Sequence, residues 1–446
     1  MTRLTDAIVG DAYRNDFQWQ VLEDLVDLET RMAGQQGEKD GAEILEGYFE
    51  AVGLRDVHLD EFDIDGWWRG TSSIETGGSH SQRYGKDYQV IALPGTPAGT
   101  VEGELVDVGY GRPEDFETAD CEGKIVLASS ETPDDYGRWI HRMEKYVSAA
   151  NAGAVGFVFT NHIEGCLPPT GEVGYDNRPG SIPAVGVSKE LGARLARHAE
   201  DGDLSVTVDV DCRNEPSTSV NVVGDIGPDT DEMVLLTAHV DTHDIAEGAN
   251  DNGAGSVLAT EAARLLARME DELETRVRVV VFGSEEIGLK GAYHAMNTYD
   301  LDTVKCIVNI DGAGRDRTLS VNANEFDDLL DAFEVVTDER SIPLVSSNTV
   351  SPHGDQWAFV QEGVPGVMVS STSPDKSGRG WGHTHADTLD KVDLRDLREH
   401  AVTIADAVCA LTEPDREVPS RSREDTRDLI DAGYEQELKL GGRWSY

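Results

Sequence analysis

Histidine and acidic residues follow several apolar runs that have the length of buried strands. They are His239 and Asp241 after MVLLTA, Asp251 in GANDNGAG, Glu285 and Glu286 after RVRVVVFGS, Asp311 after CIVNI, and His383 and His385 in SGRGWGHTHADT. The carboxyl ends of parallel strands form the ligand crevice of an open sheet. We therefore expect these side chains to meet at one edge of such a sheet.

The residue types in this set favour a metal site. Imidazole and carboxylate ligands without a nearby thiolate suit zinc or a similar divalent metal at a catalytic site with an open position. If one carboxylate bridges two ions, each ion needs only two further protein ligands. Two metals about 3.5 to 4 Å apart can clamp a hydroxide and polarise a carbonyl. The residues predict metal-assisted hydrolysis, with two divalent ions as cofactors and zinc as the favoured metal.

Three acidic residues of the set have further expected roles. Neighbouring side chains of an extended backbone point to opposite sides, so one of Glu285 and Glu286 can bind metal while the other faces the substrate water as a general base. Asp241 lies two residues after His239. It can accept the second imidazole N–H and fix the tautomer, although an acid in a turn is the alternative interpretation.

The elements around these residues predict an α/β fold. From residue 217 onward, strand patterns alternate with helical stretches of roughly 10 to 15 residues, which is typical of a doubly wound, mainly parallel sheet with helices on both faces. Residues 17–65 indicate helix, turn, helix and strand. The expected division is a discontinuous catalytic domain at 1–97 and 213–412, an inserted β-rich module at 98–212, and a polar C-terminal tail at 413–446 without a core segment.

Composition limits the partners. The chain has 446 residues, with 85 acidic against 38 basic side chains and a net charge of −47. Such a surface repels nucleic acid and anionic membranes, so we expect neither as a partner. An acid-rich chain with only 10 Lys resembles proteins of salt-loving organisms. Five cysteines without a C-x-x-C pair, no apolar leader and no membrane span favour a cytoplasmic protein. The sequence leaves the oligomeric state open.

Taken in order, the polar segments resemble a known enzyme family. The motifs are H-x-D, N-D-N-G, S-E-E-x-G-L-x-G, N-I-D-G and G-H-T-x-x-D-T, and they span about 239–388. Together they resemble the two-zinc exopeptidases, a family that contains bacterial leucyl-type aminopeptidases, glutamate carboxypeptidase and the metal-free transferrin receptor ectodomain. The module at 98–212 resembles the protease-associated domain that several members carry as an insertion.

The resemblance implies a role for each motif residue. Asp251 would bridge the ions, His239 and Asp311 would complete one site, Glu286 and His383 would complete the other, and Glu285 would be the general base. His385 fits the family motif less well than His383. A cis peptide between Asp251 and Asn252 is also implied. On this basis we expect an aminopeptidase that hydrolyses the N-terminal residues of peptides.

Other activities of the same family stay open. A carboxypeptidase or dipeptidase would need cations for the free carboxylate of its substrate. The candidate cations near the motif loops are Arg315, Arg317, Lys376 and Arg379. Glutaminyl cyclisation and a non-catalytic binding role are less favoured, the latter because all five ligands are present. Two residues depart from the family pattern: Gly382 stands where carboxypeptidase-like relatives often have Tyr, and Gln356 where His is common.

Overall fold

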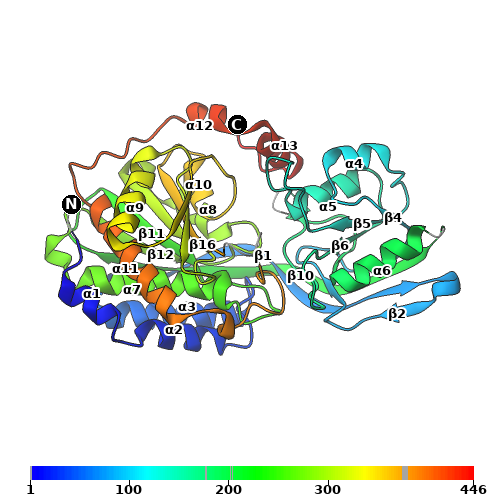
Figure 1. Ribbon diagram of the computed structural model, residues 1–446, viewed down its shortest axis with the longest axis horizontal. Helices are drawn as coiled ribbons and strands as arrows, with labels where there is room; N and C mark the ends of the chain where they lie inside the picture. Colours follow the sequence, from blue (N-terminus) through cyan, green and yellow to red (C-terminus); the bar gives the residue numbers. More distant parts are fainter. Residues whose placement is uncertain (1–2, 176–177, 201, 203, 374–379) are drawn as a thin grey trace.

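The computed structural model describes residues 3–175, 178–200, 202, 204–373 and 380–446. Within this part of the chain, a 14-stranded sheet runs through two lobes. Figure 1 shows the larger lobe on the left and the smaller lobe on the right. Each lobe contains one end of this sheet, and we call them the larger lobe and the smaller lobe.

Parallel strands form the centre of the larger lobe. They are β11 (Met233–His239), β12 (Arg276–Phe282), β13 (Val304–Ile310) and β16 (Gly366–Thr372). Their order is β16-β13-β11-β12, and each neighbouring pair is parallel. Every residue of β11 and β13 is buried. Such strands are apolar on both faces because helices cover both faces of the sheet. Beyond β16 lie β14 (Thr318–Asn322), which is antiparallel to it, and β15 (Leu344–Ser347).

Helices pack on both faces of this sheet, as predicted. One layer contains α1 (Asp6–Ala12), α2 (Phe17–Val26), α3 (Gln36–Val52), α7 (Gly255–Ala267), α9 (Asp327–Arg340) and α11 (Leu394–Leu411). The other face carries α8 (Lys290–Thr298) and α10 (Gln356–Val360), which contact each other. The central helix α7 is buried along most of its length, with 0% exposure for Leu258, Ala262 and Leu266. The short 3-10 turns are η1 (Gly78–His80), η3 (Glu270–Glu272), η4 (Leu301–Thr303) and η5 (Leu389–Lys391).

Two long antiparallel strands join the lobes. β1 (Arg55–Thr76) and β10 (Ser205–Ile226) each have 22 residues and pair along nearly their whole length. Figure 1 shows both strands reaching from the larger lobe into the smaller one. Gly70 lies where they approach closely, since a Cβ there would be 2.5 Å from the Asp211 carbonyl oxygen. The predicted boundary at residues 212/213 falls inside β10, so the strand itself is continuous across it.

The smaller lobe is a mixed sheet with helices. Its strands are β2 (Gln82–Tyr84), β3 (Val90–Ala92), β4 (Gly99–Asp107), β5 (Ile125–Ser129), β6 (Gly156–Thr160) and β9 (Ala184–Val187), with a separate pair β7 (Gly174–Tyr175) and β8 (Arg178–Pro179). Its helices are α4 (Pro113–Thr118), α5 (Arg142–Asn151) and α6 (Lys189–Glu200). β3 pairs with β9 in this lobe, although the predicted boundary placed it in the catalytic domain.

The C-terminal segment differs from the prediction of a tail without a core segment, which was wrong. It forms α12 (Arg423–Leu429) and α13 (Ala432–Leu440). Ile430 and Leu438 are buried in the core of the larger lobe, whereas Leu440 packs on the core of the smaller lobe. Figure 1 shows α13 crossing to the smaller lobe beside α5. The segment therefore ties the two lobes together.

No helix in the described residues combines the length and the apolar character that a membrane span requires.

Candidate metal centre

The first cluster lies at the carboxyl ends of β11 and β13. His239 is the last residue of β11 and Asp311 directly follows β13. The His239 Nε2 atom lies 3.5 Å from Asp251 Oδ1 and 3.5 Å from Asp311 Oδ1. One ligand atom from each of these three residues can therefore reach a common metal ion.

The second cluster lies beside the first. His383 Nε2 is 3.3 Å from Glu286 Oε2, and the same carboxylate oxygen is 2.9 Å from His243 Nε2. The two imidazole rings meet edge to face, with 4.5 Å between their centres. Glu286, His243 and His383 thus form a second set of three possible ligands, all of them buried.

Asp251 connects the two clusters. Its Oδ1 faces His239, and its Oδ2 lies 3.3 Å from His383 Nε2. Burial alone would raise the pKa of Asp251, but the two imidazoles hold it well below its usual value. An ionised carboxylate with one oxygen toward each cluster is the arrangement that a bridging ligand needs.

The side chains of both clusters fit metal ions better than they fit one another. Among the described residues, His239 Nε2, His243 Nδ1 and Glu286 Oε1 are buried without a hydrogen-bond partner. Buried polar atoms are nearly always paired, so a group of unpaired ones at one place indicates a missing ligand. Burial also lowers the pKa of His243 and favours the neutral imidazole, which is the form that binds metal.

The loop that carries Asp251 is fixed by neighbouring side chains. Asp387, in the last motif, accepts hydrogen bonds at 2.9 Å from the backbone N–H groups of Asn250 and Asp251. Thr242 donates to the Asp251 carbonyl oxygen at 2.7 Å. The peptide between Asp251 and Asn252 is cis, as the resemblance implied. Thr242 and Asp387, which lie far apart in the sequence, therefore fix the position of this loop together.

Asp241 holds the backbone of the two glutamates. Its carboxylate accepts hydrogen bonds from the N–H groups of Glu285 at 3.0 Å and Glu286 at 3.1 Å. The His239 Nδ1 atom lies 3.0 Å from the Asp241 carbonyl oxygen and 3.4 Å from its carboxylate. The main-chain oxygen is thus the better partner for fixing the tautomer, which we had expected the carboxylate to do.

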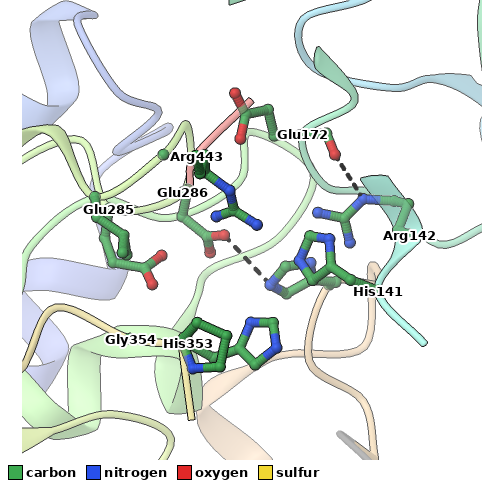
Figure 2. A pocket seen from close by; sticks show the side chains of 12 residues that line it. His141, Arg142, Glu172, Glu285, Glu286, His353, Gly354 and Arg443 are labelled. Atoms are coloured by element: carbon green, nitrogen blue, oxygen red, sulfur yellow. Dashed lines mark hydrogen bonds and ion pairs between the residues drawn. The ribbon is translucent and has the colours of Figure 1, made fainter. Parts of the chain in front are cut away.

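Glu285 lies beside the clusters without belonging to either set of ligands. It lines a pocket with Glu286, and Figure 2 shows both carboxylates reaching into it from the same side. Burial raises the pKa of Glu285 well above its usual value, and the charge of Asp355 adds to the shift. Asp355 itself is fully buried, and its two carboxylate oxygens have no partner among the described residues.

The smaller lobe holds one of the possible ligands in place. The Thr170 N–H donates to the His383 carbonyl oxygen at 2.8 Å, and the Thr170 carbonyl oxygen is 3.3 Å from His383 Nδ1. In contrast, both ring nitrogens of His385 face main-chain oxygens, those of Ile245 and Asp87. His383 is therefore the histidine of this segment that joins the clusters.

Two further sequence expectations have structural outcomes. Gln356 is buried and donates to the His353 carbonyl oxygen at 2.6 Å, so it supports the loop beside the site. Arg317 pairs with Glu399 at the surface. Lys376 and Arg379 lie outside the described residues.

Sequence reasoning missed His243. It stands four positions after His239 in H-V-D-T-H, and the spacing itself was the available indication of a second imidazole near the metal. It reaches the second cluster because the chain from 240 to 251 folds back over the strand ends. Arg31 fixes this fold by donating hydrogen bonds to the main-chain oxygens of Val240, Glu247 and Gly248, all at 2.9 Å.

Replacing His243 by Ala should weaken the second metal position selectively. A direct ligand contributes at least as much as the residues that only orient ligands, so we expect a loss of about tenfold or more in affinity for one of two ions. Metal titration with calorimetry measures this. His385→Ala is the matched control and should leave both affinities unchanged; equal affinities for His243→Ala and the original protein would remove His243 from the ligand set.

Known proteins match the chain along both lobes. Residues 221–408 match "Peptidase family M28", and residues 101–195 match "PA domain". The M28 match spans the segment that carries both clusters. The chain is 29% identical over 357 residues to leucine aminopeptidase 2 of Trichophyton rubrum, covering 75% of this chain and 67% of the relative. It is 27% identical over 394 residues to aminopeptidase YwaD of Bacillus subtilis, covering 85% and 80%.

Solved structures agree with the fold of this chain. A peptidase M28 precursor from Shewanella amazonensis superposes with a TM-score of 0.79 at 23% identity, covering 93% of this chain and 98% of that one. The smaller lobe corresponds to the PA domain, which confirms the inserted module that the sequence predicted. The matches to a peptidase family and to aminopeptidases, together with the clusters, support a metallopeptidase whose two clusters fit a pair of zinc ions.

Proposed function

We propose that this protein is an aminopeptidase that removes N-terminal residues from peptides. One observation carries the proposal: Asp251 joins two sets of ligands, and Glu285 lies beside them at the wall of the same pocket. The names of the relatives from Trichophyton rubrum and Bacillus subtilis support the exopeptidase class.

The chemistry divides between the metal ions and the protein. When bound, two divalent ions would polarise the peptide carbonyl and lower the pKa of water. In our proposal, the Glu285 carboxylate takes a proton from the attacking water and passes it to the departing amine nitrogen. Asp241 keeps Glu285 in place through the backbone N–H. His239, Asp251, Glu286, Asp311 and His383 would hold the ions, with His243 as a further ligand of the second cluster.

Blocked peptides test the proposal directly. In multimolar salt, we expect hydrolysis of free and C-blocked peptides, no hydrolysis of N-blocked peptides, and loss of all activity with a chelator. Cleavage of N-blocked peptides with retention of the chelator effect would instead indicate a carboxypeptidase. That second candidate is supported by the two arginines, Arg142 and Arg443, that line the pocket beside Glu285.

We also propose a cytoplasmic setting at high salt. All five cysteines are free, and four of them are buried. Few disulfides and a large acid excess are typical of cytosolic proteins that work among concentrated counterions. With a net charge of −47, the acidic side chains repel one another most strongly in dilute buffer.

The melting temperature should therefore rise with salt. The Debye length falls from about 10 Å at 0.1 M to about 3 Å at 1 M, so added salt screens the acidic surface. Calorimetric melts in KCl from dilute to multimolar concentration measure the effect. A melting temperature that does not change over this range would contradict the proposed setting.

A further inference from the structure

A small cavity adjoins the metal centre, and its walls come from the larger lobe, the smaller lobe and the C-terminal segment. Its volume is about 60 Å³, several times the roughly 10 to 15 Å³ that one water needs. Glu285 and Glu286 form the end at the metal centre. Arg142 comes from α5 of the smaller lobe and Arg443 from the segment after α13, and Figure 2 shows both extending into the cavity.

The smaller lobe fixes Arg142. This residue is 6% exposed, and its Nε donates to the Glu172 carbonyl oxygen at 2.9 Å. Its guanidinium lies directly over Gly171, where a Cβ would be 2.0 Å from Arg142 Cζ. Only glycine leaves room for the guanidinium at this position, so the local sequence is suited to holding it at the cavity wall.

Arg443 is held by a contact within the C-terminal segment and keeps a buried N–H donor without a partner among the described residues. Its Nη2 lies 3.5 Å from Glu437 Oε1, a carboxylate that is fully buried. Among the described residues, the buried Nε atom of Arg443 has no hydrogen-bond acceptor, and Nη2 has only the long contact with Glu437. A buried donor without an acceptor is costly, and a ligand oxygen in the cavity would satisfy it.

The ligand that suits these two side chains is a carboxylate. Guanidinium groups match carboxylates in geometry as well as in charge. A net charge of −47 disfavours an anion over most of this protein, so a cavity with two arginines is a local exception. Of the acidic side chains that line it, Glu285 and Glu286 belong to the metal end and Glu172 lies near the arginines, while Glu437 contacts Arg443 from outside the lining.

We propose that Arg142 and Arg443 bind a carboxylate of the substrate next to the bond that is cleaved. This rests on the proposed peptidase function and narrows the substrate to peptides that carry a carboxylate on the residue after the cleaved bond. The carboxylate is either the free C-terminus of the residue after the cleaved bond or an acidic side chain on that residue. If the carboxylate is the free C-terminus, the enzyme prefers dipeptides. If it is an acidic side chain, the enzyme prefers peptides with an acidic residue after the cleaved bond.

Paired substrates measure the effect with the metal-loaded, full-length enzyme in multimolar KCl. Leu-Gly against Leu-Gly-amide reports the terminal carboxylate, and Leu-Asp-amide against Leu-Asn-amide reports the side chain. A hydrogen bond to a charged group contributes enough for a ratio of kcat/KM of roughly 10 to 100 in one of the two pairs. Ratios near one in both pairs would overturn the proposal.

Variants of the two arginines test whether the cavity causes the raised kcat/KM ratio. Arg443→Met should reduce the raised ratio severalfold or more, mainly through KM, and Arg443→Lys should restore part of it. Arg142→Met tests the same ratio from the other wall, and thermal melts identify any variant that does not fold. Arg427→Met is the control, because Arg427 is an exposed α12 residue paired with Asp428. A ratio that survives in both folded arginine variants would overturn the proposal.

The two proposals fail in different ways. Leucine p-nitroanilide carries no carboxylate, so its hydrolysis reports peptidase function alone. Hydrolysis of this compound together with ratios near one would reject the carboxylate site and leave the aminopeptidase standing. If no substrate of any kind is hydrolysed, the proposed function falls, and the carboxylate site falls with it.

Discussion

Replacing Glu285 by Gln is expected to lower kcat by roughly 10²- to 10⁴-fold, which is the usual contribution of a general base. The amide keeps the size of the side chain but cannot take a proton from water. Because Glu285 belongs to neither ligand set, both metal ions should stay bound. Steady-state kinetics and metal analysis of the same preparation measure the two effects.

A matched control separates the chemistry from a general loss of charge. Glu424 is exposed in the first turn of α12, far along the chain from the metal clusters, and Glu424→Gln should retain full activity. Near-normal turnover in Glu285→Gln would exclude Glu285 as the base. Loss of metal in that variant would show that the residue acts on the metal site instead.

Replacing Asp251 by Ala is expected to have the second large effect, because its two oxygens face different clusters. Without the bridge, the two ligand sets hold ions separately and less tightly. Metal polarisation of the carbonyl supplies several kcal/mol, so we expect kcat/KM to fall by about 10³-fold or more. Metal content should fall below two ions per chain.

Asp390→Ala is the control for this variant. Asp390 is exposed and pairs with Lys391, near the same loops but outside both clusters. It should keep two ions and normal kinetics. If Asp251→Ala still binds two ions with unchanged affinity, the bridging role is wrong even where activity is lost.

The strand-end residues were predictable because a parallel sheet brings its carboxyl ends to one edge. His239 and Asp311 directly end or follow buried strands whose apolar runs are plain in the sequence. The structure brings them together with Asp251, Glu286 and His383, although their roles as ligands stay predictions. His243 was missed because its spacing from His239 does not show where it lies, which depends on a loop that Arg31 holds over the strand ends.

Other features escaped prediction because the cause lies in tertiary packing. The C-terminal helices have 7 and 9 residues, so neither shows a long apolar face. Their apolar residues pack on the cores of both lobes, which are formed by residues far away in the sequence. β1 continues past the glycines at 66 and 70, which resemble a loop in the sequence. Pairing with β10 along its length keeps this stretch extended.

Anomalous diffraction at the zinc edge, from crystals of the zinc-loaded protein, tests the central claim most directly. We predict two peaks about 3.5 to 4 Å apart. One should lie against His239 and Asp311, the other against Glu286, His243 and His383, with one Asp251 oxygen on each. A single peak, or two peaks away from Asp251, would contradict the account.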